Sequence, residues 1–398
     1  MQYHGPEDSP EYVRKNLDPS RIRLQRERKG WTGKELASRL DVTPSAVSQI
    51  ERGVTTPELD TLIDLGAKLD VPINFFVERK TNTRIRLDRC HFRTKRGIPQ
   101  YRRRQSIADA SLVIQLATVL EELGVQFPEE EISDFADQMP EVDKSTSVEK
   151  MEEFALQLRD HWGLGRGPIP NLVSLFESKG IFVFPLPDGR EDEEDVDAFS
   201  VWHEGRPVVL LSSQKAASRD RLDATHELCH LTLHSDAERD LKVIEDQAFR
   251  FGGAFLAPRE TFLPECPSRW SRPAFLRLKD RWRMSMQALV RRAYDLGQLS
   301  ESSYRRANIE LRKRLAANGE EEGEWEPERP LMIQQALSLL EREVTLDDLA
   351  HRVGVHASDL RDLLDKIVDE EVLDRIDSGP STVDENGQIV TRRDKDVE

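Results

Sequence analysis

The sequence predicts a mainly α-helical protein with one small β-sheet, an α+β fold made of several domains. Apolar residues recur at helical spacing along most of the chain, whereas runs typical of strands are confined to about residues 181–211. The length of 398 residues predicts two or three domains of about 100 to 200 residues each. Basic and acidic residues are divided unevenly along the chain, which also favours separate domains.

The charge distribution indicates that only the N-terminal part meets a polyanion. The whole chain has a net charge of −16, but residues 1–104 hold 22 Lys and Arg against 14 Asp and Glu, which leaves the remainder at −24. A basic domain on an acidic body is typical of contact with nucleic acid through one face. The longest mostly apolar run, 112–120, is far shorter than the roughly 20 residues of a membrane span. Without a secretory signal, and with only three cysteines, we expect a cytoplasmic protein that makes no membrane contact.

Residues 17–80 are expected to form a domain of short helices, the first at 21–28. Thr32 can cap a second helix, with Glu35 three residues later as the other half of a capping box. Thr43 can cap a third helix that has a proline at its first position, where a missing N–H costs nothing. The apolar stripe of a fourth helix is supplied by Leu59, Leu62, Ile63 and Leu65.

Two short helices joined by a tight turn have the geometry of a helix-turn-helix motif. The string LASRLDVTPSAVSQIERGVTTPELDTLIDLGAKLDV closely resembles the lambda-repressor-like (XRE) DNA-binding family. This resemblance implies that the helix at 43–52 enters the major groove of a double-stranded operator, to which the chain binds as a homodimer. A helical bundle with no DNA role is the alternative. The implied base-reading residues are Ser45, Ser48 and Gln49, and the implied phosphate contacts are Lys34, Arg52 and Thr55.

Residues 81–160 are expected to be a basic segment followed by a helical connector. Nine Lys or Arg residues lie between 82 and 104, and they can either extend the phosphate contact or form a solvated linker. Periodicity predicts helices from 106 to 160, with interruptions near two prolines, and this connector is a possible dimer surface.

The string RLDATHELCHLTLH contains the H-E-x-x-H pattern of a zinc site. His226 and His230 are four residues apart, so on a helix they share one face and can offer two nitrogens to one metal ion. Glu227 lies about 100° around the helix, where it can deprotonate a water on the metal. Two histidines that flank a glutamate are difficult to explain as core packing alone.

A catalytic zinc site usually has three protein ligands and one open position. His234 lies eight residues from His226, about 12 Å along a helix, which is too far for both to bind the ion together with His230. Glu245 is the better third ligand because it begins a helical stripe of apolar residues and therefore points inward. Asp246 and Glu238 are the alternative ligands.

Residues 162–330 resemble the ImmA/IrrE-type metallopeptidases, small zincin domains that are often fused behind an XRE helix-turn-helix. The resemblance is carried by GRPVVLLSS, HELCH, ExxAxxFxxxFLAP and LKDRWRMSMQALVRRAYDLGQLSESSYRRA. It implies a zincin-like metallopeptidase domain at 161–318 with a single metal in each chain, either zinc or, as the alternative, manganese. By position, the metal ligands would be His226, His230 and Glu245, the general base would be Glu227, and a three-stranded sheet would include 181–186, 196–203 and 207–211.

The remaining segments have simpler interpretations. Five consecutive acidic residues at 191–195 are expected to form a solvated loop. The alternative is that they form a lid over the metal cleft or mimic phosphate. The acidic stretch 319–330 is read as a linker. The string VTLDDLAHRVGVHASDLRDLL repeats the helix-turn-helix rhythm, but its acidity disfavours DNA contact, so 331–377 is expected to be a small helical interaction or dimerisation module. A disordered tail is expected at 378–398.

Two functions remain open from the sequence. In the first, the chain is a DNA-binding transcription regulator that carries a zinc endopeptidase, whose substrate is a protein such as a repressor. In the second, the metal domain of a DNA-binding regulator senses a ligand or partner without cutting it. The complete set of motif residues favours the first.

Overall fold

The computed structural model describes residues 8–77, 91–93, 100–185, 198–203, 205–211, 217–234, 242–318, 323–379, 382–383 and 389–390. The acidic run 191–195, the alternative ligand Glu238 and most of the predicted tail lie outside these residues, as does most of the basic segment 82–104. Within the described part, no helix is long and apolar enough to cross a membrane.

The N-terminal domain is helical, and its predicted caps are confirmed. Thr32 Oγ1 accepts a hydrogen bond from the Glu35 N–H at 3.2 Å, and Glu35 Oε2 accepts one from the Thr32 N–H at 2.6 Å. Ile63 was wrongly placed on the buried face: it is 48% exposed, whereas Leu62 is fully buried. The elements are α1 (Pro10–Lys15), α2 (Pro19–Arg28), α3 (Gly33–Arg39), α4 (Pro44–Glu51), α5 (Leu59–Leu69) and the 3₁₀ helix η2 (Ile73–Phe76).

Among the residues that the structure describes, the turn between α3 and α4 recurs twice. In each copy a residue with positive φ precedes the cap of the second helix by two positions: Asp41 before Thr43, Arg283 before Ser285, and Gly354 before His356. The second copy joins α13 (Arg272–Trp282) to α14 (Met286–Asp295), and the third joins α17 (Leu346–Val353) to α18 (Ala357–Leu364). Six of the ten residues of α14 are buried, whereas only Val47 and Ile50 are buried among the eight residues of α4, so this second copy leaves much less of its second helix exposed.

The sheet contains four strands in the order β1-β3-β4-β2. Strands β2 (Phe182–Pro185), β3 (Ala198–His203) and β4 (Arg206–Leu211) confirm the three predicted strands. Strand β1 (His91–Arg93) was not predicted, because three residues in a basic run show no strand pattern. It pairs antiparallel with β3, β3 pairs antiparallel with β4, and β2 pairs parallel with β4.

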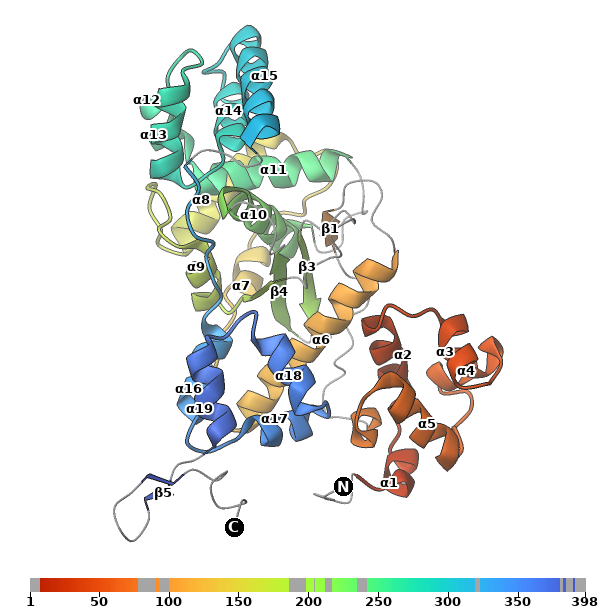
Figure 1. The fold of residues 1–398 in the computed structure, drawn as a ribbon. Coiled ribbons are helices and arrows are strands. Elements are labelled where there is room, and N and C mark those ends of the chain that lie inside the picture. The colour runs from red at the N-terminus through yellow and green to blue at the C-terminus, as the bar shows by residue number, and fades with distance from the viewer. Residues whose placement is uncertain are drawn as a thin grey trace.

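The two faces of the sheet pack into two different cores. Side chains alternate along each strand, so Phe182 and Phe184 face one core while Val183 faces the other. The first core joins the sheet to the N-terminal domain, the long helix α6 (Gln100–Glu122) and the C-terminal helices. The second core joins it to the remaining helices of the central domain (Figure 1). These are α7 (Ile132–Ala136), α8 (Val148–His161), α9 (Leu172–Ser178), α10 (Ala217–Leu233), α11 (Lys242–Leu256), α12 (Arg259–Glu265), α13, α14 and α15 (Glu301–Asn318).

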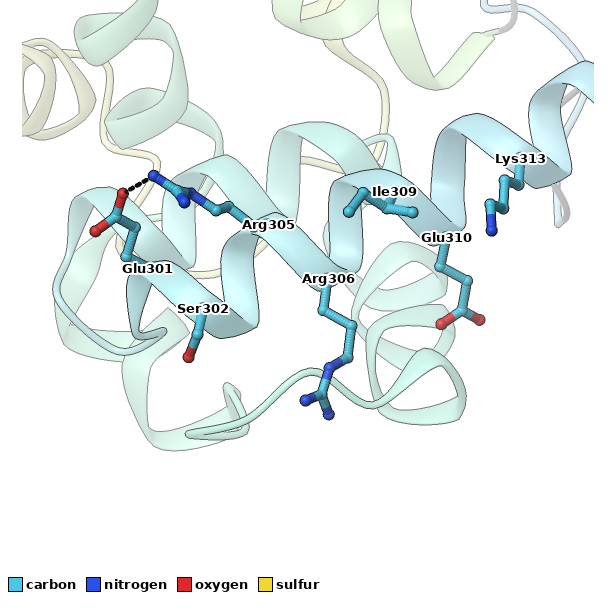
Figure 2. A pocket seen from close by; sticks show the side chains of 7 residues that line it. All are labelled: Glu301, Ser302, Arg305, Arg306, Ile309, Glu310 and Lys313. Atoms are coloured by element: carbon cyan, nitrogen blue, oxygen red, sulfur yellow. Dashed lines mark hydrogen bonds and ion pairs between the residues drawn. The ribbon is translucent and has the colours of Figure 1, made fainter.

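A shallow hollow follows the outer face of α15 (Figure 2). Ile309 lies in it and is 57% exposed, and the other lining residues come from the same helix. None of the lining residues comes from the helix that carries the H-E-x-x-H motif, so this hollow is separate from the candidate metal site.

The acidic stretch 323–330 is packed against the central domain and is not a free linker. Glu324 accepts hydrogen bonds from the backbone N–H and the hydroxyl of Ser218, at 3.1 and 2.6 Å, at the start of α10. Glu328 accepts from the N–H groups of Leu172 and Val173, at 2.7 and 3.0 Å, at the start of α9. A carboxylate at a helix N-terminus satisfies free N–H groups and the helix dipole, so these contacts stabilise both helices.

The C-terminal module packs on α6 and on the N-terminal domain of the same chain (Figure 1). Arg21 of α2 is 2% exposed, and its guanidinium donates to Gln115 Oε1 of α6 at 2.9 Å and to the Val353 carbonyl of α17 at 3.2 Å. Gln115 also donates to that carbonyl at 2.7 Å, so one buried cluster connects the three parts. The module contains α16 (Met332–Leu340), α17, α18 and α19 (Glu370–Ser378), and strands β5 (Thr382–Val383) and β6 (Ile389–Val390) follow it.

Candidate functional site

The H-E-x-x-H motif lies on α10, which is buried between the sheet and α11. His226 is fully buried and His230 is 3% exposed. Their Nε2 atoms point to the same place and are 3.0 Å apart. Both rings therefore present a nitrogen to one point beside the helix, as the i, i+4 spacing predicts.

Glu245 of α11 completes a group of three potential ligands. Its Oε2 lies 3.3 Å from His226 Nε2, and its Oε1 lies 3.6 Å from His230 Nε2. One ligand atom from each of the three residues lies within 4.8 Å of the others. Two ligands of a tetrahedral zinc ion, each bonded at about 2.1 Å, are about 3.4 Å apart, so these separations fit such an ion with its fourth position open. The alternative ligand Asp246 is exposed and is not a member of the group.

The close approach of α11 to α10 depends on Gly252. A Cβ atom at this position would lie 2.9 Å from Thr225 Oγ1 and 3.3 Å from the backbone nitrogen of His226. Only glycine leaves room for the two helices at this distance, which places Glu245 opposite the histidines. The glycine pair in FRFGGAFL was a possible sequence signal for this contact.

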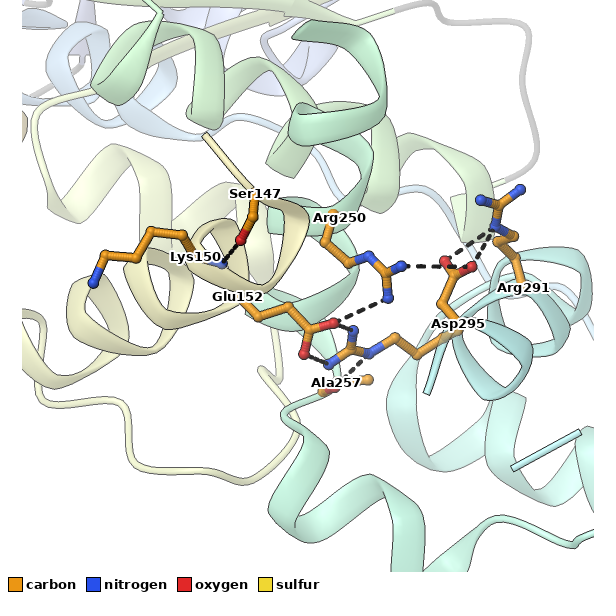
Figure 3. A network of polar contacts seen from close by, with 8 residues as sticks. Ser147, Lys150, Glu152, Arg250, Ala257, Arg291 and Asp295 are labelled. Atoms are coloured by element: carbon orange, nitrogen blue, oxygen red, sulfur yellow. Dashed lines mark hydrogen bonds and ion pairs between the residues drawn. The ribbon is translucent and has the colours of Figure 1, made fainter. Parts of the chain in front are cut away.

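A charged network fixes α11 relative to α8 and α14 (Figure 3). Glu152 of α8 accepts two hydrogen bonds from Arg292 of α14, at 2.7 and 3.2 Å, and one from Arg250 of α11 at 3.1 Å. Arg292 also donates to the Ala257 carbonyl, just after α11, at 3.1 Å. These contacts hold α11, the helix that carries Glu245, against α8 and α14.

Glu227 is fully buried and faces β3. Its Oε2 accepts a hydrogen bond from the Ser200 hydroxyl at 2.6 Å, and Ser200 is also fully buried. This contact orients a carboxylate that belongs to the same helical turn as the two histidines. Ser200 was missed by the sequence analysis; its only signal is a polar residue within an apolar strand.

His234 contacts His230 on the side of the ring opposite Glu245. Its Nδ1 lies 3.1 Å from His230 Nδ1, so His230 presents its other nitrogen, Nε2, to Glu245. A hydrogen-bond partner on the second ring nitrogen fixes the orientation of a ligand histidine. His234 is not one of the three grouped residues, as the distance along the helix predicts. The adjacent Cys229 is buried, and burial raises the pKa of its thiol well above the usual value, which keeps it neutral.

The predicted DNA-contacting residues belong to α3, α4 and the turn that follows α4. Val47 and Ile50 of α4 face the core, which turns the other side of this helix outward. Glu51, at the end of α4, accepts two hydrogen bonds from Arg26 of α2, at 2.6 and 2.9 Å, so the helix is held firmly. Lys34, Ser45, Ser48, Arg52 and Thr55 are exposed, and Gln49 is half-buried.

Two families match separate parts of the chain. Residues 22–76, from α2 to η2, match the helix-turn-helix family. Residues 176–294, which include α10 and α11, match the IrrE N-terminal-like domain. No curated protein matches the chain.

Proposed function

Because the chain joins a helix-turn-helix domain to an IrrE N-terminal-like, metallopeptidase-type domain, we propose that it is a transcription regulator that cleaves a protein with a zinc-dependent centre. His226, His230 and Glu245 would hold the zinc ion, and Glu227 would be the general base. A repressor is the expected substrate. The observation that carries this proposal is the convergence of two imidazole nitrogens and one carboxylate, with a second carboxylate from the same helical turn.

Each residue of this centre has a distinct task. A zinc ion supplies a Lewis acid that makes a peptide carbonyl more electrophilic and a water molecule easier to deprotonate. Glu227 takes the proton from the attacking water and later delivers it to the leaving amine. Ser200 holds one oxygen of Glu227, so the carboxylate keeps a fixed orientation while its proton is exchanged. His234 fixes the ring of His230, so the ligand set is organised before the ion binds.

Cleavage by the purified chain is the test of this proposal. Candidate repressors incubated with the protein should be cut, a chelator should stop the reaction, and added zinc should restore it. Loss of the metal removes the Lewis acid, so the rate should fall to the uncatalysed background. Cleavage that continues in the chelator, or a failure to cut any candidate in the zinc-loaded state, would contradict a zinc peptidase.

The N-terminal domain is proposed to bind an operator as a homodimer, with α4 in the major groove. Gln49→Ala should reduce discrimination between operator and mismatched DNA by about 1 to 3 kcal/mol, because an amide can read a base edge. Arg52→Ala should instead weaken binding to all sequences, because a guanidinium beside the groove contacts phosphate. It should also reduce the slope of log affinity against log salt by about 0.9.

Fluorescence anisotropy with labelled duplexes at several salt concentrations measures both effects. The Gln49→Ala protein serves as the control for the salt slope, since it keeps every cationic side chain. An affinity that does not depend on salt would show that the predicted surface does not contact DNA.

A further inference from the structure

Strand β3 borders the candidate metal centre and is paired on both sides. On one side it pairs with β4, which follows it in the sequence. On the other side it pairs with β1, which comes from the segment between the N-terminal domain and α6 (Figure 1). Three residues, His91–Arg93, thus bring the chain that follows the helix-turn-helix domain to the edge of the central sheet.

The register places β1 beside the general base. His91 lies opposite Ser200 in the antiparallel pair, and the Ser200 hydroxyl donates to Glu227 at 2.6 Å. Farther along β3, the Trp202 indole donates to the Leu231 carbonyl of α10 at 2.9 Å, which fixes this strand on the helix that carries the motif. Since neighbouring strands are about 4.8 Å apart, the backbone of His91 lies one strand spacing from the residue that holds Glu227.

An extended segment on a sheet edge is a common way for a protein to bind a peptide. Main-chain hydrogen bonds hold such a segment whatever its sequence, and pockets for alternate side chains add specificity. A peptidase must hold its substrate extended for a water molecule to reach the scissile carbonyl. The side of β3 that faces away from β4, where β1 now pairs, is the edge at which a peptide could be held beside Glu227.

From this placement we propose that the side of β3 opposite β4 is the substrate-binding edge and that β1 is an intramolecular substrate held on it. The proposal rests on the peptidase function proposed above. The chain would then cut itself within His91–Arg93 and separate its DNA-binding domain covalently from α6 and the metal domain. One protein would carry the DNA-binding domain, the peptidase centre and the site at which they are separated.

The step is a hydrolysis and needs only water as a second reactant. The water oxygen bonds to the carbonyl carbon of one β1 peptide bond, and Glu227 accepts the proton that this water loses. The C–N bond then breaks, and the proton passes to the leaving nitrogen. The products are an N-terminal fragment with a new carboxylate and a C-terminal fragment with a new amine.

Because β1 belongs to the same chain as the proposed peptidase centre, it should be cut in preference to the same segment of another molecule. A segment joined by a short linker has an effective concentration in the millimolar range, far above a micromolar protein solution. Cleavage should therefore be first order, with a rate constant that changes less than about twofold when the protein is diluted 100-fold. A substrate supplied by a second copy would instead react more slowly on dilution.

The experiment uses the full chain loaded with zinc, and intact-mass spectrometry follows its fragments with time. Three samples are compared: the wild type, the Glu227→Gln protein, and a mixture of the wild type with isotope-labelled Glu227→Gln protein. We expect the wild type to be cut within His91–Arg93, and the labelled Glu227→Gln chain to stay intact both alone and in the mixture. Casein, an unfolded protein, is added to a parallel sample as a general peptidase substrate.

Each other outcome overturns the proposal and shows which part of it is wrong. If casein is cut while the wild-type chain stays whole, β1 is not a substrate but the proposed peptidase function survives. If neither is cut, both fail. Labelled Glu227→Gln chains that are cut in the mixture as fast as the wild type would show that the substrate is a second copy. Cleavage of Glu227→Gln alone would show that the candidate centre is not responsible.

Discussion

Replacing Glu245 with alanine is expected to remove the metal from the protein. The two histidine nitrogens alone form an incomplete site, and the carboxylate that balances the charge of the ion is lost. Changes to groups that merely support a ligand weaken metal binding about 10- to 100-fold, so the loss of a ligand itself should weaken it by more than about 100-fold. Elemental analysis after dialysis measures the effect as the zinc content of each chain.

Asp246→Ala is the matched control, because Asp246 is the exposed neighbour of Glu245 on the same helix. It should keep its metal, and so should Glu227→Gln, because Glu227 is the proposed general base and not one of the three proposed ligands. Full metal content in the Glu245→Ala protein would move the third ligand elsewhere and contradict the site described above.

Replacing Arg159 with methionine is expected to destabilise the central domain by about 3 kcal/mol. Arg159 is fully buried on α8 and donates to the carbonyls of Gly165, Gly167 and Phe255, at 2.8, 2.6 and 2.5 Å. Burial lowers the pKa of its guanidinium to about 10, so the group is still charged at neutral pH. Methionine fills similar space but leaves three carbonyls without this donor, and each buried group left unsatisfied costs about 1 to 3 kcal/mol.

Thermal unfolding measures this change, and a domain of this size should lose about 6 to 12 °C in melting temperature. Arg166→Ala is the control, because Arg166 pairs with the exposed Asp160 in the same region. A surface ion pair contributes about 1 kcal/mol or less, so this variant should melt almost as the wild type does. Equal melting temperatures for the wild type and Arg159→Met would show that the carbonyls find other donors.

The helices, and the approach of His226, His230 and Glu245 to one another, were predictable because local spacing largely determines them. Capping residues mark the start of a helix, and the i, i+4 spacing places His226 and His230 on one face before any tertiary contact is known. Glu245 was predictable for the same reason, since a carboxylate on an apolar stripe points inward. The three longer strands were also predictable, because their apolar runs are dense enough to show the pattern.

Features that depend on long-range pairing were not predictable. Strand β1 exists because β3 offers it an edge, so its three residues carry no strand signal of their own. Ser200 contacts Glu227 only because β3 packs against α10. Glu324 and Glu328 lie in a stretch with the composition of a linker, and only the folded chain brings them to the starts of two helices. Ile63 shows the opposite error, since a residue that fits a helical stripe can still face solvent.

The most direct test of the central claim is the rate at which Glu227→Gln protein cleaves a repressor that the wild type cuts. Glutamine has nearly the same shape but cannot accept the proton of the attacking water, so the rate should fall at least about 100-fold. Zinc content, melting temperature and operator affinity should stay unchanged, and a strain with this variant should no longer derepress its targets. A Glu227→Gln protein that still cuts the repressor, or a strain that regulates as the wild type does, would contradict the peptidase and favour a DNA-binding sensor.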